Sequence, residues 1–403
     1  MRSRSGEAGF TGPGVRSDLR VKVEERERGG IVVDLVSRVE AYYGNAIRRQ
    51  VRDQLEHLGL ESAHVTINDM GALPFTIAAR VETAARRAGL LDEHHLDTLS
   101  EPDRAPSERR RLRRSRLYLP GNDPKYMVNA GLYGSDALIL DLEDSVHPAE
   151  KDGARLLVAN AIRRLDFGPA EIMVRINQLP VGLEDLATVI PSGPDLILVP
   201  KVEDPSEIEE VDRTIARMLE ELGWQRPIWI MPILESALGV EMAFDIARCC
   251  DRVVALTVGL EDLTANLGVP GSAKEQATRY ARARIVNAAV AAAVQPIDSV
   301  FADVSDLEGL ASWCERSKAL GFEGMGCLHP RQIPIVHQAF TPTPEEIERA
   351  QAIVAAFERA REEGLAIVSI GSKMIDAPIV QRAVKVVERA RALGLLVEER
   401  GGQ

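Results

Sequence analysis

Eight short apolar runs recur along the middle and later part of this 403-residue chain, and segments of helical length separate them. Each run is almost continuously hydrophobic, which is typical of parallel strands buried on both faces. Strands that alternate with crossover helices predict an α/β fold, and eight parallel strands close a (β/α)₈ TIM barrel. The runs lie at residues 116–119, 138–141, 172–175, 196–199, 228–231, 253–256, 297–300 and 325–328.

A smaller unit precedes the predicted barrel. Alternating residues 19–23 and 31–35 flank Gly29 and Gly30, which predicts a hairpin, and helical patterns follow over about 45–58 and 74–88. The last stretch, after the eighth run, is helical and is expected to cover the barrel mouth as a lid or to reach a neighbouring subunit. The predicted divisions are a small α/β domain at 1–90, a polar linker at 91–112, the barrel at 113–340 and the helical lid at 341–403.

Composition and charge argue against several classes of function. The net charge of −12 and the pI near 5.3 argue against a nucleic-acid partner, because a phosphate backbone needs a clustered basic face. No window approaches the roughly 20 apolar residues of a membrane span, and no secretory signal is visible at the N-terminus, so we expect no membrane partner and a cytoplasmic location. The four cysteines form no CxxC pair and the seven histidines form no zinc pattern.

Two carboxylates stand out at the ends of predicted strands. Glu235 closes the fifth run and Asp262 follows the sixth. Active sites of such barrels collect at the C-terminal strand ends, and Mg²⁺ prefers oxygen ligands, so this pair predicts a magnesium site. Arg175, on the third strand, would supply compensating positive charge. Polar residues end most of the other strands too, and Asp123, Asp144 and Asp303 fit a salt bridge or a helix cap equally well.

At these residues the chain resembles the β-subunit of citrate lyase and its relatives malyl-CoA lyase and citramalyl-CoA lyase, over about 113–395. The resemblance implies a barrel of the phosphoenolpyruvate-utilising type in a trimer or hexamer. It also implies Glu235 and Asp262 as Mg²⁺ ligands, Arg175 as the substrate-binding and catalytic arginine, and Asp376 as an acid-base residue from the lid of an adjacent subunit. The matching stretches are 114–123, 140–146, 174–177, 200–203, 234–239, 259–263, 328–333 and 374–378.

The first 90 residues resemble the γ-subunit of citrate lyase, its acyl carrier protein. In that family a serine followed by aspartate carries a phosphoribosyl-dephospho-CoA arm, and Ser17 with Asp18 matches it. The residues before Ser17 differ from the small and acidic surroundings of the family's serine, and the alternative is that Ser17 only caps or starts a strand. The two resemblances together imply that an acyl carrier domain and a lyase domain are fused in one polypeptide.

These features predict a carbon–carbon lyase that cleaves a citryl thioester to oxaloacetate and an acetyl thioester, with an acyl-transferase subunit as a further partner. One alternative is a lyase acting on free malyl-CoA or citramalyl-CoA with a vestigial carrier domain. Another is a non-catalytic assembly subunit, which would have no reason to keep Glu235, Asp262, Arg175 and Asp376 together.

Overall fold

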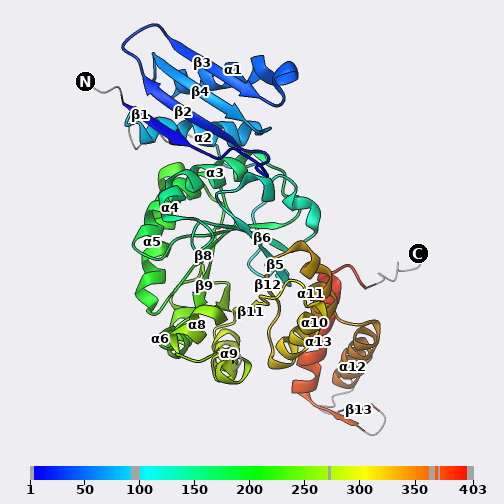
Figure 1. Ribbon diagram of the computed structural model, residues 1–403. Helices are drawn as coiled ribbons and strands as arrows, with labels where there is room; N and C mark the ends of the chain where they lie inside the picture. The colour runs from blue at the N-terminus through cyan, green and yellow to red at the C-terminus, as the bar shows by residue number, and fades with distance from the viewer. Residues whose placement is uncertain (1–3, 92–99, 271–273, 363–367, 371–372, 397–403) are drawn as a thin grey trace.

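The computed structural model describes residues 4–91, 100–270, 274–362, 368–370 and 373–396. Figure 1 shows a small N-terminal unit in blue above a larger barrel, with the C-terminal helices beside the barrel. No helix within these ranges is long and apolar enough to cross a membrane.

The N-terminal unit is a four-stranded sheet with two helices packed on one face. Its strands run in the order β1-β2-β4-β3, in which β4 pairs antiparallel with β2 and parallel with β3. The predicted hairpin is therefore wrong: the turn at Gly29 and Gly30 joins two strands that β4 separates. The elements are β1 (Ser5–Ala8), β2 (Leu19–Glu25), β3 (Ile31–Ser37), α1 (Glu40–His57), β4 (Ala63–Asp69) and α2 (Pro74–Arg87).

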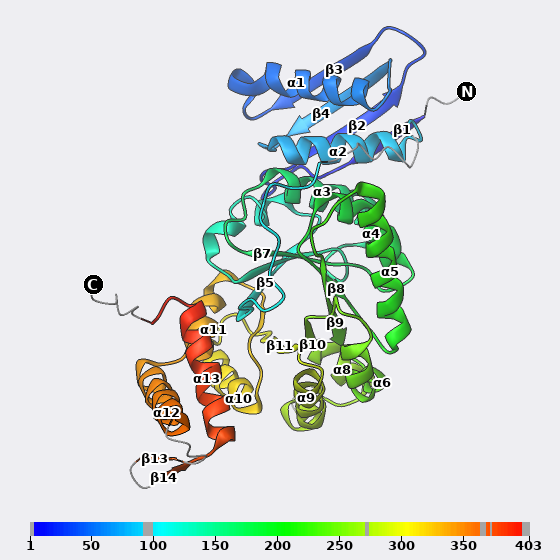
Figure 2. The same ribbon diagram turned by 180° about the vertical axis from the view of Figure 1, so that it is seen from behind.

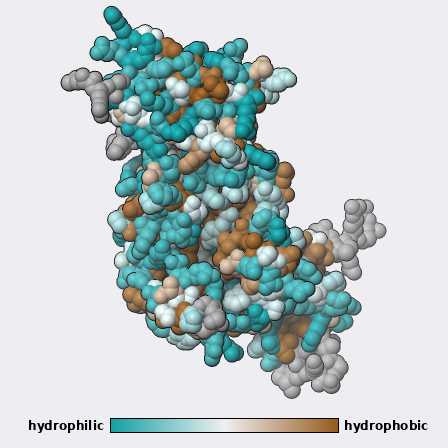
Figure 3. Space-filling model, in the orientation of Figure 1, coloured by the Kyte–Doolittle hydropathy of each residue, from teal (hydrophilic) through white to brown (hydrophobic). Residues whose placement is uncertain are grey.

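Alternation along these strands decides which face of the sheet is buried. In β3 the residues Ile31, Val33 and Leu35 are buried under the helices, whereas Val32 and Val36 are 38% and 69% exposed on the other face. Figure 2 shows α1 and α2 in front of the sheet, and the apolar patch over the uncovered face is visible in Figure 3.

Eight parallel strands close into a barrel in the order β10-β11-β12-β5-β6-β7-β8-β9, which confirms the predicted fold class. Every predicted run contributes to one strand, because residues buried on both faces are mostly apolar. The strands are β5 (Ser115–Pro120), β6 (Ala137–Asp141), β7 (Glu171–Arg175), β8 (Leu196–Val199), β9 (Trp229–Leu234), β10 (Ala255–Val258), β11 (Gln295–Val300) and β12 (Met325–Cys327).

Helices surround the barrel and bury the outward-facing residues of its strands. A smaller apolar cluster, with Ile139, Met173 and Leu198, fills the interior. The helices are α3 (Lys151–Arg164), α4 (Val181–Val189), α5 (Pro205–Leu222), α6 (Ala237–Glu241), α7 (Ala243–Arg248), α8 (Leu260–Asn266), α9 (Lys274–Ala291), α10 (Leu307–Leu320), α11 (Ile333–Phe340), α12 (Pro344–Glu362) and α13 (Ala377–Ala392), with short 3-10 turns at 124–126, 130–133, 148–150, 190–192 and 330–332.

The C-terminal segment packs beside the barrel. Helices α12 and α13 lie next to α10 and α11 in both views, and Arg389 on α13 forms an ion pair with Glu323 before β12. An antiparallel pair of short strands, β13 (Val368–Ile370) and β14 (Lys373–Ile375), joins the two helices and points away from the barrel. The sequence predicted the helices but not this strand pair.

The N-terminal unit is docked on the barrel through buried and half-buried charges. Arg80 on α2 donates two hydrogen bonds to Asp18 and a third, of 2.7 Å, to the backbone carbonyl of Asn122 after β5. Arg87 on the same helix holds Asp152 of α3 at 2.6 Å. The loop before β2, which contains Ser17, therefore lies against the C-terminal rim of the barrel.

Candidate active site

A cavity of about 180 Å³ opens at the C-terminal ends of the barrel strands. This is the end where barrels of this class carry their active sites. Its walls contain Glu235, Asp262 and Arg175, so the structure brings three of the predicted site residues together. The other lining residues are Arg116, Tyr118, Asp144, Ile233, Thr257, Val258, Gly259, Leu260, Glu261, Ser299, Val300 and Leu328.

Glu235 is the most perturbed acid of this cavity. It follows β9, is 5% exposed and accepts a 2.8 Å hydrogen bond from the backbone N–H of Lys201. Burial, and then the charges of Asp262 and Glu143, raise the pKa of Glu235 from 4.5 to about 8. A carboxylate in this position is stable only when a positive charge lies close to it.

Asp262 enters the cavity from the first turn of α8, directly after β10. The residue that allows the two acids to share this space is Gly259. A Cβ atom at residue 259 would lie 2.2 Å from Glu235 Oε2 and 2.8 Å from Glu235 Cβ. No side chain larger than hydrogen fits there while Glu235 keeps its place.

Arg175 ends β7 and is fixed by acids from the neighbouring strand end. Its Nε and Nη2 atoms donate to the two carboxylate oxygens of Asp141 at 2.6 and 2.7 Å, and Nη1 lies 2.9 Å from Glu143 Oε2. The guanidinium also covers the ring of Tyr118. Burial alone would lower the pKa of Arg175, but the hydrogen bonds and charge of Asp141 outweigh it and raise that pKa.

Lys201 connects the arginine side of the cavity to the acid side. Its backbone is in the left-handed region, with φ of 54°, which turns its N–H toward Glu235. Its Nζ atom donates to Glu143 at 2.8 Å. The positive charges of Arg175 and Lys201 are thus balanced by Asp141 and Glu143.

The donor set of Glu235 and Asp262 fits a magnesium ion. Within the described ranges, no group of three or more His, Cys, Asp or Glu side chains is arranged to hold a metal. Two carboxylates suffice for Mg²⁺, which usually keeps several waters and takes further oxygens from the substrate. Burial first, and the charge of Asp262 after it, raise the pKa of Glu235, so a cation bound beside the two acids would stabilise its charged form. Their role as ligands stays a prediction.

Asp376 does not line this cavity. It is the exposed N-cap of α13, where its side chain accepts a 3.3 Å hydrogen bond from the N–H of Ile379. Asp123 and Asp303 also cap local turns, by accepting from the N–H groups of Lys125 and Ser305.

His329 is the N-cap of a 3-10 turn, where its side chain accepts a hydrogen bond from the backbone N–H of Arg331. Ser17 lies half-buried in the loop before β2, with φ of 60°.

Sequence reasoning missed four polar residues of the cavity: Arg116, Tyr118, Thr257 and Ser299. Arg116 and Tyr118 lie inside a run that was read as apolar and buried on both faces. The signal that could have identified them is their spacing of two, since alternate residues of a strand point to the barrel interior.

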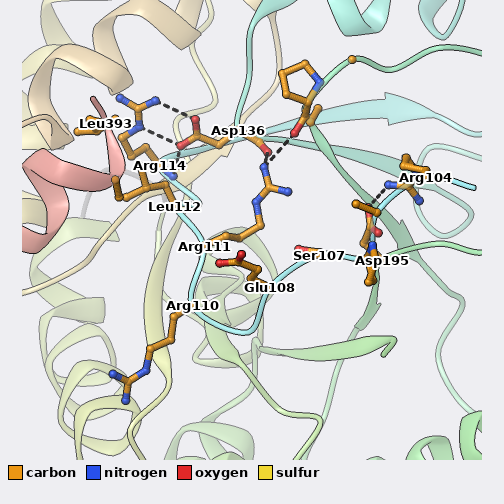
Figure 4. Close-up of a pocket in the computed structure, with 16 residues that line it drawn as sticks. Arg104, Ser107, Glu108, Arg110, Arg111, Leu112, Arg114, Asp136, Asp195 and Leu393 are labelled. Carbon is orange, nitrogen blue, oxygen red and sulfur yellow. Dashed lines mark hydrogen bonds and ion pairs between the residues drawn. The ribbon is translucent and has the colours of Figure 1, made fainter. Parts of the chain in front are cut away.

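A larger cavity, of about 740 Å³, lies at the opposite end of the barrel, next to the N-terminal strand ends. Residues 104–108 and 110–112 line it, and Figure 4 shows that two of its acids are already paired: Asp136 with Arg114, and Asp195 with Arg104. Active sites of these barrels do not lie at this end, so we assign no chemistry to it.

The fold and the cavity define a parallel eight-stranded barrel with two acids and a fixed arginine at its C-terminal rim, and the sequence comparisons give the family. Residues 114–330 match the family described as HpcH/HpaI aldolase/citrate lyase. Residues 9–88 match the ACP family described as malonate decarboxylase delta subunit (MdcD), which confirms the resemblance of this segment to an acyl carrier subunit.

Three relatives illustrate the range of the family. The citrate lyase subunit beta of Leuconostoc mesenteroides subsp. cremoris is 38% identical, over 72% of this chain and 97% of that protein. The mitochondrial citramalyl-CoA lyase of Mus musculus is 33% identical, over 70% of this chain and 87% of its own. The crystal structure of CitE from Mycobacterium tuberculosis, in complex with magnesium, acetoacetate and coenzyme A, has a TM-score of 0.56 and 29% identity, over 70% of this chain and 100% of that one.

The chain therefore belongs to the HpcH/HpaI aldolase/citrate lyase family and is a carbon–carbon lyase.

Proposed function

We propose that this chain is a magnesium-dependent lyase that cleaves a citryl thioester to oxaloacetate and an acetyl thioester. The observation that carries the proposal is that the acids Glu235 and Asp262 line one cavity with a fixed arginine. The relatives named citrate lyase subunit beta and the magnesium complex of CitE support it.

Glu235 and Asp262 would hold the ion. When bound, a divalent cation stabilises negative charge on the substrate's hydroxyl and carboxylate oxygens as a Lewis acid. Arg175 is held in one orientation by Asp141, so it can receive a carboxylate or the developing enolate oxygen of the thioester without first losing side-chain freedom.

Breaking the carbon–carbon bond leaves an enolate of the acetyl thioester, which needs a proton on carbon. We assign that proton transfer to Asp376 of an adjacent subunit; in the condensation direction the same carboxylate would remove the proton. The exposed position of Asp376 outside its own cavity is consistent with this assignment. The protein would then act as a homo-oligomer, with a trimer or hexamer expected.

The N-terminal unit would carry the thioester on an arm attached to Ser17. Arg80 links the Asp18 loop to the barrel rim at Asn122, so an arm on Ser17 would start close to the end of the barrel where the cavity opens. An acyl-transferase partner would load the carrier, and the cytosol is the expected location. The competing proposal, a lyase for free citramalyl-CoA or malyl-CoA, is favoured by the 33% identity to citramalyl-CoA lyase.

The test is turnover of citryl-, malyl- and citramalyl-CoA by the purified protein, with and without Mg²⁺, together with its intact mass. We expect Mg²⁺-dependent cleavage of the citryl thioester and, if Ser17 is modified, a mass increment that Ser17→Ala removes. Efficient cleavage of malyl-CoA or citramalyl-CoA by an unmodified chain would favour the competing proposal. No cleavage of any thioester, free or carrier-bound, would indicate an assembly subunit.

A further inference from the structure

Arg116 is a buried arginine in the wall of the active-site cavity. It points into the barrel from β5, is 1% exposed, and lies one strand layer below Tyr118. Its Nη2 atom donates to Thr257 Oγ1 at 2.9 Å and to the backbone carbonyl of Asp298 at 3.2 Å, and Nη1 contacts Met231 Sδ at 3.1 Å. Residues of three other strands, β9, β10 and β11, thus contact this guanidinium under the cavity.

No carboxylate among the described residues forms an ion pair with Arg116. Asp298 contributes only its backbone carbonyl, because its carboxylate is bound to Arg282 and Ser317. The Nε–H of Arg116 is buried without a hydrogen-bond partner. A buried cation without a counter-charge is unfavourable for folding, which suggests that a ligand supplies the missing anion.

The charges of the other cavity residues are balanced. Asp141 and Glu143 neutralise Arg175 and Lys201, and a divalent cation would neutralise Glu235 and Asp262. Arg175 and Lys201 also pair with Asp144, whereas Arg116 is the one arginine lining this cavity, among the described residues, that has no ion pair.

We propose that Arg116 and Thr257 form an anion-binding floor. This floor receives the carboxylate of the substrate's carboxymethyl group, which becomes part of oxaloacetate. This inference rests on the proposed function and deepens it. A citryl group carries a carboxymethyl group where a citramalyl group carries a methyl group, so an arginine at the floor selects the first. Thr257 adds a hydroxyl whose oxygen accepts from Arg116, which leaves its hydrogen free for a carboxylate oxygen.

The experiment is calorimetric titration of the intact protein with oxaloacetate and with pyruvate, both in saturating MgCl₂. These keto acids differ only in the carboxylate in question. The wild-type protein is expected to prefer oxaloacetate. Arg116→Met, which keeps an unbranched apolar stem and removes the charge, should weaken oxaloacetate binding by about 10- to 100-fold, the range for loss of charge-assisted hydrogen bonds. Pyruvate binding should change by less than about twofold.

Two further variants keep the test decisive. Thr257→Val should reduce the preference for oxaloacetate in the same direction, and Thr257→Ser should restore it. If Arg116→Met does not fold, Arg116→Lys and Thr257→Val decide the question, because both should lower the ratio of the two affinities. Arg331→Met, at an exposed arginine outside the cavity, serves as the matched control and should leave both affinities unchanged.

An equal loss of both keto acids, or no loss of either, would overturn the inference. If the wild-type protein cleaves a citryl thioester but Arg116→Met leaves the affinity ratio unchanged, this inference alone fails. If the wild-type protein binds neither keto acid in MgCl₂ and cleaves no citryl thioester, the proposed function fails and the inference fails with it.

Discussion

Replacing Glu235 with glutamine should stabilise the metal-free protein above neutral pH. The pKa of Glu235 is raised from 4.5 to about 8, so the folded chain holds the proton more tightly than the unfolded chain does. The resulting penalty on folding is absent below about pH 4.5, grows between 4.5 and 8, and is complete above 8. One pKa unit corresponds to about 1.4 kcal/mol, which gives about 5 kcal/mol as an upper limit.

Because structural relaxation reduces such penalties, we expect Glu235→Gln to be more stable than the wild type by about 2–5 kcal/mol at pH 9 and by little at pH 4.5. For a domain of this size that is a rise of about 4–20 °C in the melting temperature. Glutamine keeps the oxygen that accepts from Lys201, so the change removes charge and little else. The Glu235→Gln variant should also lose lyase activity.

The assay is thermal unfolding from pH 4.5 to 9 in the presence of a chelator, with Glu308→Gln as the control. Glu308 is exposed at the start of α10 and should follow the wild type at every pH. Addition of Mg²⁺ at pH 8 should raise the melting temperature of the wild type and not that of Glu235→Gln. The reasoning is refuted if Glu235→Gln follows the pH dependence of the wild type, or is less stable than the wild type at pH 9.

Three further predictions concern other parts of the chain. Gly259→Ala should reduce kcat by about 100-fold with little loss of stability, because its Cβ would displace the carboxylate of Glu235; kinetics and circular dichroism would check this. Arg80→Met should cost about 3–5 kcal/mol by leaving Asp18 buried and unpaired, and Arg80→Met with Asp18→Leu should recover much of it in urea unfolding. Co-expression of Glu235→Gln with Asp376→Asn should restore activity that neither variant has alone; failure would argue against a shared site.

The barrel was predictable because burial on both faces makes each strand a nearly continuous apolar run in the sequence. The run at residues 138–141, for example, lies entirely within β6, whose residues are all buried. Because all eight strands are parallel, their C-terminal ends lie on one rim of the barrel, so Glu235 and Arg175 could be expected in one cavity.

The hairpin failed because a turn signal is local and strand pairing is not. Gly29 and Gly30 do reverse the chain, with positive φ at both residues. Yet β4, which comes later in the sequence, lies between β2 and β3 in the sheet and pairs with both. The sequence of a turn carries no information about a third strand that inserts between its neighbours.

The floor of the cavity could not be predicted from the sequence, and a comparison of two buried arginines shows the reason. Arg282 and Arg116 both lie in largely apolar surroundings and both reach Asp298. Arg282 meets the carboxylate of Asp298, so its charge is balanced within the chain and its role is structural. Arg116 meets only the carbonyl of the same residue, and its charge remains for a ligand. Which of the two arginines takes the carboxylate depends on the face of β11 that each approaches, and the face is fixed only when the barrel closes.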